Sequence, residues 1–268
     1  MGSNKTVRIK WPAGLNPSDD SYYLWVGRRI RCEERAKNND GEGEEKEAFV
    51  DTNSQLKTWL HLASIKSRRA IELNSITEYF EPLMEFLLSL AEEEQVILVG
   101  HSFGGLCISV AMELFPTKIA AAVFVSAWLP SPDLNYLDLL QEYKSRSEFN
   151  SIMLDENTNN HQNGSRAFDP QFLASNTYQL SPSGPFPIFG DEDLQENTQL
   201  TRDNYGIVAK VYIVCEQDKL FKHDFQLFMI ERNPPNDVKV IAGADHMSMF
   251  SKPQELFSYL QEITDTYY

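Results

Sequence analysis

A serine in a glycine-rich turn is the first feature of the sequence that could carry chemistry. Ser102 lies in Gly100-His101-Ser102-Phe103-Gly104, a G-x-S-x-G pattern between an apolar run and a helical stretch. This context is typical of a nucleophile elbow, a sharp strand-to-helix turn that exposes the serine Oγ. We expect the N–H of Phe103 to be one oxyanion donor, because a helix N-terminus favours developing negative charge.

A serine hydroxyl is a poor nucleophile and needs a base. His246 is the best candidate, because it directly follows the last predicted strand, in Gly243-Ala244-Asp245-His246, at the sheet edge where the serine also emerges. The other four histidines are less suited: one lies inside the turn itself and three lie in surroundings typical of a surface, namely His101, His61, His161 and His223.

The acid that orients the base should follow a strand between the other two residues. Asp218 does so, a short loop after the apolar run 211–215, and Glu216 is its nearest rival. Asp245 is less suited, because a neighbour in sequence rarely turns its carboxylate onto the ring Nδ1. The order Ser102, Asp218, His246 is that of the α/β-hydrolases.

The elements that must position these residues alternate along the chain from residue 75. Ser75-Ile76-Thr77-Glu78 is a capping box that precedes an apolar helical face. The alternation predicts an α/β fold, with a mostly parallel sheet covered by helices on both faces. The expected strands are 96–99, 119–127, 211–215 and 238–242, separated by a turn at 100–105 and by helices at 106–115, 221–230 and 253–267.

Two stretches break this alternation. Between residues 130 and 201 we expect a cap inserted over the sheet. Residues 1–58 form a divergent N-terminal segment that we expect to be partly disordered, because residues 1–37 show no clean period and residues 38–47 are a charged run of low hydrophobicity. The hydrolase domain is therefore expected at 59–268.

Composition excludes several classes of function. The net charge of −15 disfavours nucleic acid as a partner. No apolar run approaches the ~20 residues of a membrane span, and the N-terminus lacks the apolar region of a signal peptide. No cluster has metal-ligand spacing and no glycine loop of the phosphate-binding kind follows the first strand, so we expect no metal and no organic cofactor.

The cysteines and the N-terminus bear on the cellular localisation of the protein. Cys32, Cys107 and Cys215 are scattered and odd in number, as expected of a reduced, cytoplasmic protein. Residues 1–6, Met-Gly-Ser-Asn-Lys-Thr, fit the pattern for myristoylation of Gly2, for which an ordinary polar start is the alternative interpretation.

Four motifs in the right order resemble the plant methylesterase family: residues 96–105, 118–125, 211–219 and 243–249. The resemblance, over roughly residues 59–268, implies an α/β-hydrolase with a small cap and no cofactor. It implies hydrolysis of small methyl esters of the plant-hormone type, such as methyl salicylate, methyl jasmonate or methyl indole acetate. It places the triad on Ser102, Asp218 and His246, and it suggests a homodimer.

One position separates the esterases of this family from its hydroxynitrile lyases. The lyases carry a lysine directly after the catalytic histidine, and this chain has Met247 there, as the esterases do. We expect Met247 to contact the substrate. Because an apolar side chain cannot stabilise cyanide, we expect no lyase activity.

The N-terminal third departs from the family. We find no His-Gly-Ala loop in residues 1–58, although this loop supplies the second oxyanion donor in the family, and His61 stands where an aspartate is usual. The cap is also shortened around residues 180–189. These departures predict reduced turnover, since losing one oxyanion donor typically lowers kcat by ~10²–10³-fold. They also leave open an alternative function, a catalytically weak protein that binds a small aromatic acid.

Overall fold

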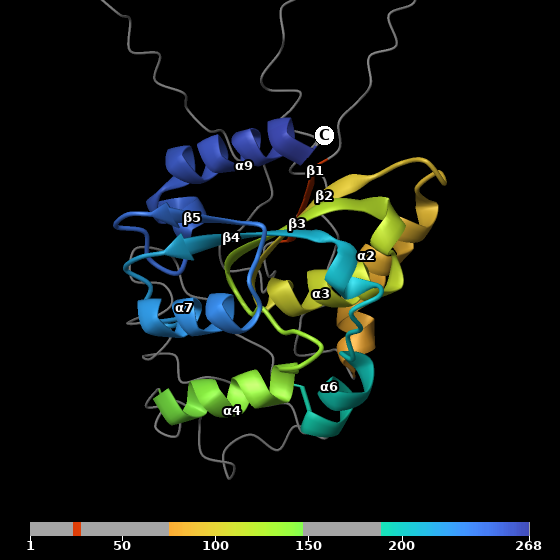
Figure 1. The fold of residues 1–268 in the computed structure, drawn as a ribbon, viewed down its shortest axis with the longest axis horizontal. Helices are drawn as coiled ribbons and strands as arrows, with labels where there is room; N and C mark the ends of the chain where they lie inside the picture. The colour runs from red at the N-terminus through yellow and green to blue at the C-terminus, as the bar shows by residue number, and fades with distance from the viewer. Residues whose placement is uncertain (1–23, 28–74, 147–188, 268) are drawn as a thin grey trace, which may run out of the picture.

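The computed structural model describes residues 24–27, 75–146 and 189–267 (Figure 1). Its strands are β1 (Leu24–Gly27), β2 (Val96–Ser102), β3 (Ile119–Ala127), β4 (Ala209–Cys215) and β5 (Asp237–Ile241). Its helices are α2 (Ile76–Ser89), α3 (Gly104–Leu114), α4 (Tyr136–Arg146), α6 (Asp191–Asn197), α7 (His223–Arg232), α8 (Ser248–Ser251) and α9 (Pro253–Tyr267), with short 3-10 helices η2 (Pro116–Lys118) and η5 (Tyr205–Ile207).

The strands form one sheet in the order β1-β2-β3-β4-β5. The pairs from β2 to β5 are parallel, and β1 runs antiparallel to β2. The carboxyl ends of the four parallel strands therefore meet at one edge of the sheet, which is where ligands bind in open α/β sheets. The predicted α/β class with a mostly parallel sheet is confirmed.

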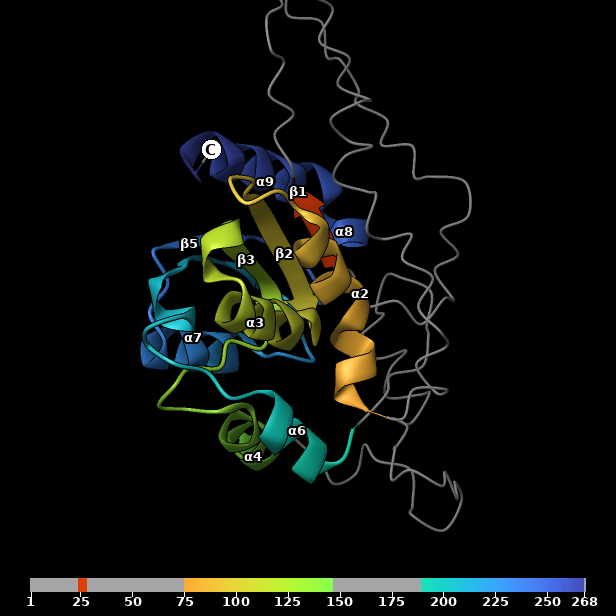
Figure 2. The ribbon, with the colours of Figure 1, turned by 90° about the vertical axis from the view of Figure 1, so that its right-hand side faces the viewer.

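Alternate side chains of the sheet feed two separate cores. Val96, Leu98 and Val214 belong to the cluster on the face covered by α2, α3 and α7. Ile97 and Val99 belong to the cluster on the other face, which α8 and α9 cover. Helices α4 and α6 lie side by side beyond α3 and α7, as a further layer on that face (Figures 1 and 2). In the part of the chain that the structure describes, no helix combines the length and apolar character needed to cross a membrane.

The observed elements differ from the expected ones at two places. Strand β2 continues through Ser102 and α3 begins at Gly104, so the turn predicted at 100–105 is confined to about one residue. Strand β1 lies in the N-terminal segment and was not predicted. Its four residues are too few for a periodic pattern, and it pairs with a strand some seventy residues further along the chain.

Most of the N-terminal segment and residues 147–188 lie outside the described residues. The domain boundaries, the cap at 130–201, the charged run, Gly2, Cys32, His61 and His161 therefore stay predictions.

The N-terminus of α2 is capped twice. The Ser75 Oγ accepts the N–H of Glu78 at 3.3 Å, as the capping box predicts. The Asp193 carboxylate, on α6, accepts the N–H of Ile76 at 2.6 Å. This second cap was not predictable from local sequence, and it joins α6 to a helix of the core.

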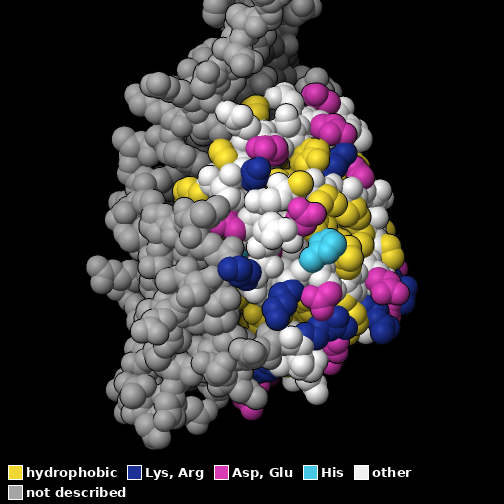
Figure 3. Space-filling view, turned by 90° about the vertical axis from the view of Figure 1, so that its left-hand side faces the viewer, with side chains coloured by type: hydrophobic (Ala, Val, Ile, Leu, Met, Phe, Trp, Pro, Cys, Tyr) yellow, Lys and Arg dark blue, Asp and Glu magenta, His cyan; other side chains and the backbone are white. Residues whose placement is uncertain are grey.

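Strand β5 is an edge of the sheet and exposes Val238 (39%) and Val240 (47%). Two side chains partly cover its backbone: the Asp237 carboxylate accepts the N–H of Val238 at 2.8 Å, and the Tyr259 hydroxyl donates to the carbonyl of Val240 at 3.1 Å. On the face that carries α7 and β5, hydrophobic side chains are mixed with charges of both signs (Figure 3). These features disfavour addition of another strand at this edge.

The Glu113 carboxylate, near the end of α3, holds the segment that leads into β4. It accepts the N–H of Thr201 at 2.7 Å, the Thr201 hydroxyl at 2.8 Å, the Asn204 amide at 3.1 Å and the N–H of Tyr205 at 3.2 Å. Partial burial acts to raise the pKa of Glu113, but these hydrogen bonds outweigh it and the pKa is lowered.

We therefore expect Glu113→Gln to reduce the free energy of unfolding by about 1–2 kcal/mol at neutral pH, because glutamine replaces one acceptor oxygen with a donor. A lowered folded-state pKa means that this stability is present above the unfolded pKa and is lost as the pH falls through the folded one. Urea unfolding of both proteins at about pH 7 and about pH 4 measures this. An equal difference at the two pH values, or none at either, would contradict the assignment.

Candidate active site

Ser102 stands at the junction of β2 and α3 with a backbone φ of +54°, a conformation that residues other than glycine rarely adopt. Close packing on both sides imposes this turn. A Cβ on Gly100 would lie 2.6 Å from the carbonyl oxygen of Gly104, and a Cβ on Gly105 would lie 2.2 Å from that of Trp128. Gly105 lies outside the five-residue motif, so sequence reasoning missed this contact, which brings α3 onto the end of β3.

The structure brings Ser102, His246 and Asp218 together. The Ser102 hydroxyl donates to His246 Nε2 at 3.0 Å, and His246 Nδ1–H donates to Asp218 Oδ2 at 2.7 Å. All three residues are buried, with Ser102 2% exposed and His246 0%. Ser102 lies at the end of β2, His246 in the loop after β5, and Asp218 in the loop after β4.

The Asp218 carboxylate receives further donors. Its Oδ1 accepts the N–H groups of Leu220 at 2.7 Å and Phe221 at 2.9 Å, and its Oδ2 also accepts the hydroxyl of Ser126. A buried carboxylate stays ionised only where such donors replace water. With His246, Asp218 has four donors, and its geometry suits an acceptor that orients the imidazole.

The rival carboxylates point elsewhere. Glu216 is exposed, and its carboxylate accepts the N–H of Gly243 at 3.1 Å. Asp245 is buried, but one of its oxygens accepts the N–H of Met247 at 3.0 Å and the other has no hydrogen-bond partner among the described residues. The ring Nδ1 of His246 bonds instead to Asp218.

Gln226, buried on α7, supports the loop that carries Asp218. Its amide nitrogen donates to the carbonyls of Cys215 at 2.9 Å and Phe221 at 2.7 Å, while its amide oxygen accepts the N–H of Cys215 at 3.1 Å. The two ends of the loop are thus tied to one side chain. Sequence reasoning missed Gln226, because a glutamine in a helix carries no local signal of such contacts.

His101 supports the loop of His246. The two rings lie 4.6 Å apart, and the Nε2 of His101 bonds to the backbone carbonyl of His246 at 2.7 Å. Burial lowers the pKa of His101 well below its ordinary value, and the neighbouring His246 lowers it further. His101 is therefore neutral at pH 7 and donates from Nε2, because a carbonyl only accepts. His223, by contrast, is exposed at the start of α7, as expected.

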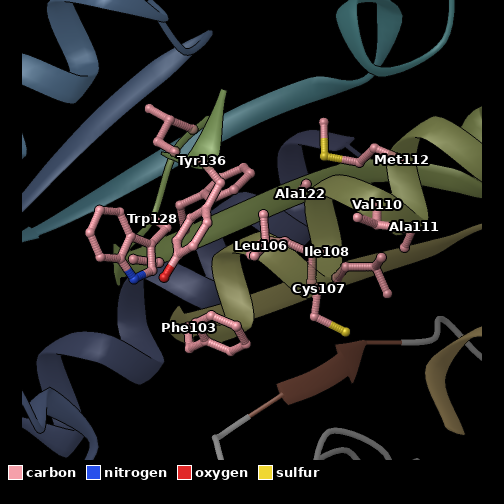
Figure 4. Packing of buried hydrophobic residues seen from close by; sticks show 14 of the residues in the cluster. Phe103, Leu106, Cys107, Ile108, Val110, Ala111, Met112, Ala122, Trp128 and Tyr136 are labelled. Atoms are coloured by element: carbon pink, nitrogen blue, oxygen red, sulfur yellow. The ribbon is translucent and has the colours of Figure 1, made fainter. Parts of the chain in front are cut away.

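The residue after Ser102 opens a layer of aromatic rings. Phe103 stands at the N-cap of α3, and its ring lies 5.9 Å from that of Phe189 and 5.9 Å from that of Tyr136. Trp128 and Tyr136 pack edge to face, 5.0 Å apart, beside the helix that begins at the elbow (Figure 4). Phe221 places its ring edge to face with His246, at 5.4 Å. The ring of Phe221 thus places apolar surface directly against His246.

Met247 was expected to contact the substrate. The structure buries its side chain in the cluster between the sheet and α9, whereas Phe103 and its aromatic neighbours belong to the cluster on the other face. Contact of Met247 with a substrate stays a prediction, and this placement lends it no support.

Comparison with known proteins identifies the family. Residues 67–258 match the Alpha/beta hydrolase family. Methyl jasmonate esterase 1 of Vitis vinifera is 47% identical over 222 residues, which cover 78% of this chain and 85% of the relative. Salicylic acid-binding protein 2 of Nicotiana tabacum is 37% identical over 214 residues, which cover 75% of this chain and 82% of the relative. The chain belongs to the plant methylesterase family of α/β-hydrolases.

A solved structure of another member agrees with this assignment. The crystal structure of polyneuridine aldehyde esterase superposes with a TM-score of 0.66 at 32% identity, covering 75% of this chain and 84% of that one. As a methylesterase family member, the chain is a carboxylic ester hydrolase of the α/β class. The resemblance noted from four short motifs is thereby confirmed over about three quarters of the chain.

The close approach at Gly105 yields a prediction. We expect Gly105→Ala to destabilise the fold by roughly 3 kcal/mol or more, because the new Cβ would overlap backbone atoms of Trp128 that cannot move away. Gly190→Ala is a matched control, since a Cβ there would meet nothing within 4 Å. Thermal unfolding measures both. Equal melting temperatures for the two variants would show that α3 does not depend on this contact.

Proposed function

We propose that this methylesterase family member hydrolyses small methyl esters with Ser102 as nucleophile, His246 as general base and Asp218 as the acid that orients the base. The observation that carries the proposal is the pair of hydrogen bonds from Ser102 to His246 and from His246 to Asp218. A serine, a base and an orienting carboxylate in this relation are the constellation of serine esterases.

The first half of the reaction forms an acyl-enzyme. As the Ser102 Oγ bonds to the ester carbonyl carbon, its proton passes to His246 Nε2 and the carbonyl π electrons move to oxygen. The N–H of Phe103, at the start of α3, is the proposed donor to that oxyanion. His246 then gives its proton to the methoxy oxygen, the C–O bond breaks, and methanol leaves.

The second half repeats the sequence with water. His246 takes a proton from water while the hydroxide oxygen bonds to the acyl carbon, and it returns that proton to Ser102 Oγ as the acyl–serine bond breaks. Asp218 keeps its charge throughout and stabilises the imidazolium that forms in each half. The free acid is the second product.

Two observations support an acid component of the plant-hormone type. The relatives include an esterase named for methyl jasmonate. Aromatic rings around Ser102, such as Phe103 and Phe221, offer apolar surface to a compact acyl group. The methyl esters of salicylate, jasmonate and indole acetate are the substrates to try first. The alternative function, binding of an aromatic acid without turnover, is not favoured, because relatives such as methyl jasmonate esterase 1 of Vitis vinifera and methylesterase 3 of Arabidopsis thaliana are named as esterases.

A cytoplasmic site of action is part of the proposal. Cys107 and Cys215 are buried, unpaired thiols, as suits a reducing compartment. The homodimer stays a prediction. So does the reduced turnover that we expect from the divergent N-terminal segment, because most of that segment lies outside the described ranges.

We expect Ser102→Ala to lower turnover of methyl jasmonate or methyl salicylate by about 10⁴-fold or more, because no other group can form the acyl-enzyme. Ser109→Ala is a matched control: that serine is also buried, its hydroxyl donates to the carbonyl of Gly105 in its own helix at 2.7 Å, and its other hydrogen-bond partner is Tyr205, which is not part of the triad. Methanol release and p-nitrophenyl acetate hydrolysis measure the activity. If Ser102→Ala retained most of the turnover on both esters, the proposed mechanism would be wrong.

A further inference from the structure

Ser126 is a buried serine at the carboxyl end of β3, in an apolar stretch of the sheet. Its backbone φ is +39°, and in the described ranges Ser102 is the only other non-glycine residue with a positive φ. Glycine adopts such a conformation at lower free energy than serine does. A side chain retained at a strained position next to an active site indicates that its chemistry is used there.

The contact of the Ser126 hydroxyl gives that chemistry. It donates to Asp218 Oδ2, the same oxygen that accepts His246 Nδ1–H at 2.7 Å. The other oxygen of Asp218 is occupied by the N–H groups of Leu220 and Phe221. Those two donors come from the loop of Asp218 itself, so they cannot set where the loop stands relative to the sheet. Ser126 is the donor that joins the carboxylate to the neighbouring strand.

The strained turn at Ser126 is held from β4. The Tyr212 hydroxyl donates to the carbonyl of Ala127 at 3.0 Å and accepts the N–H of Ala127 at 3.2 Å. Both polar backbone groups that follow Ser126 are therefore fixed by one buried side chain. The serine hydroxyl is held in place against Asp218 rather than turning freely.

The titratable groups on β4 that neighbour Asp218 are neutral. Tyr212 and Cys215 of β4 both lie near it, and burial raises the pKa of each well above its ordinary value, so both stay neutral. The nearby Asp245 also raises the pKa of the Cys215 thiol. His101, whose pKa is lowered, is neutral beside His246.

We propose that Ser126 is a positioning residue of this active site, which fixes the Asp218 carboxylate relative to β3 and shares its charge through Oδ2. The inference rests on the proposed function. Without the hydroxyl, the loop that carries the carboxylate can shift away from His246 Nδ1 in the ground state. While the carboxylate still faces the ring, its negative charge is no longer shared with Ser126, so it stabilises the protonated form of His246 more strongly.

The test measures the activation of Ser102 without any natural ester. The full chain, Ser126→Ala, Ser126→Gly and the control Ser109→Ala are reacted with a fluorophosphonate, and the labelling rate of Ser102 is followed by mass spectrometry across the pH range. We expect both Ser126 variants to react about 10-fold more slowly, the effect of one hydrogen bond to a charged group, and Ser109→Ala to stay within about 2-fold. The acid side of the pH–rate profile should move to higher pH in the Ser126 variants only. A merely structural role would leave this profile unchanged.

Several outcomes would overturn the proposal. It is wrong if the Ser126 variants label at the wild-type rate with the wild-type profile, or if Ser109→Ala is slowed equally. It is also wrong if both Ser126 variants fail to fold by circular dichroism, because the hydroxyl would then serve the fold. If wild-type Ser102 is labelled but no methyl ester is hydrolysed, the proposed function fails and the comparison at Ser126 still decides the positioning role. If wild-type Ser102 is not labelled, both fail.

Discussion

The buried carboxylate of Asp218 is the constraint on which the arrangement of this site depends. An ionised carboxylate without water must be satisfied by donors, and these come from three places: Ser126 at the end of β3, the N–H groups of Leu220 and Phe221, and His246 after β5. The ends of β3, β4 and β5 must therefore keep their relative positions. A parallel sheet provides this, because its ladders fix neighbouring strand ends to one another.

Several contacts outside the reacting groups keep those strand ends in place. Gln226 ties both ends of the loop of Asp218 to α7, and His101 holds the carbonyl of His246. Tyr212 fixes the turn after β3. Because a displacement of about 1 Å can cost a hundredfold in rate, we expect these contacts to act on catalysis through geometry. The ring of Phe221 packs against His246, and in apolar surroundings each hydrogen bond to a charge is stronger.

The sequence predicted the residues that the structure brings together, because their signals are local. Ser102 lies in a motif whose strand and helix are both evident, and His246 directly follows a recognisable strand. Asp218 required the order of the strands, and its rival Asp245 could be set aside only by an argument about loop geometry. The family followed from four short motifs and is shown by relatives that cover about three quarters of the chain.

What the sequence did not predict depends on partners far away along the chain. Ser126 meets Asp218 across 92 residues, and it stands in an apolar run where nothing marks it. Gly105 is needed because of Trp128, and Asp193 caps α2 across 117 residues. Strand β1 has four residues and a single partner strand among the described residues, so its pattern is too short to recognise. Each of these contacts joins segments that only the folded chain brings together.

The comparison of the two buried acids tests the central claim most directly. The kcat and KM of Asp218→Asn and Asp245→Asn on one methyl ester should differ strongly. We predict that Asp218→Asn lowers kcat on the order of 10⁴-fold with little change in KM, because an amide no longer fixes the imidazole tautomer that accepts the serine proton. Asp245→Asn, whose carboxylate bonds to the backbone of Met247, should leave kcat within about 10-fold of the wild type. A large loss in Asp245→Asn beside a small one in Asp218→Asn would show that the acid of this site has been misassigned.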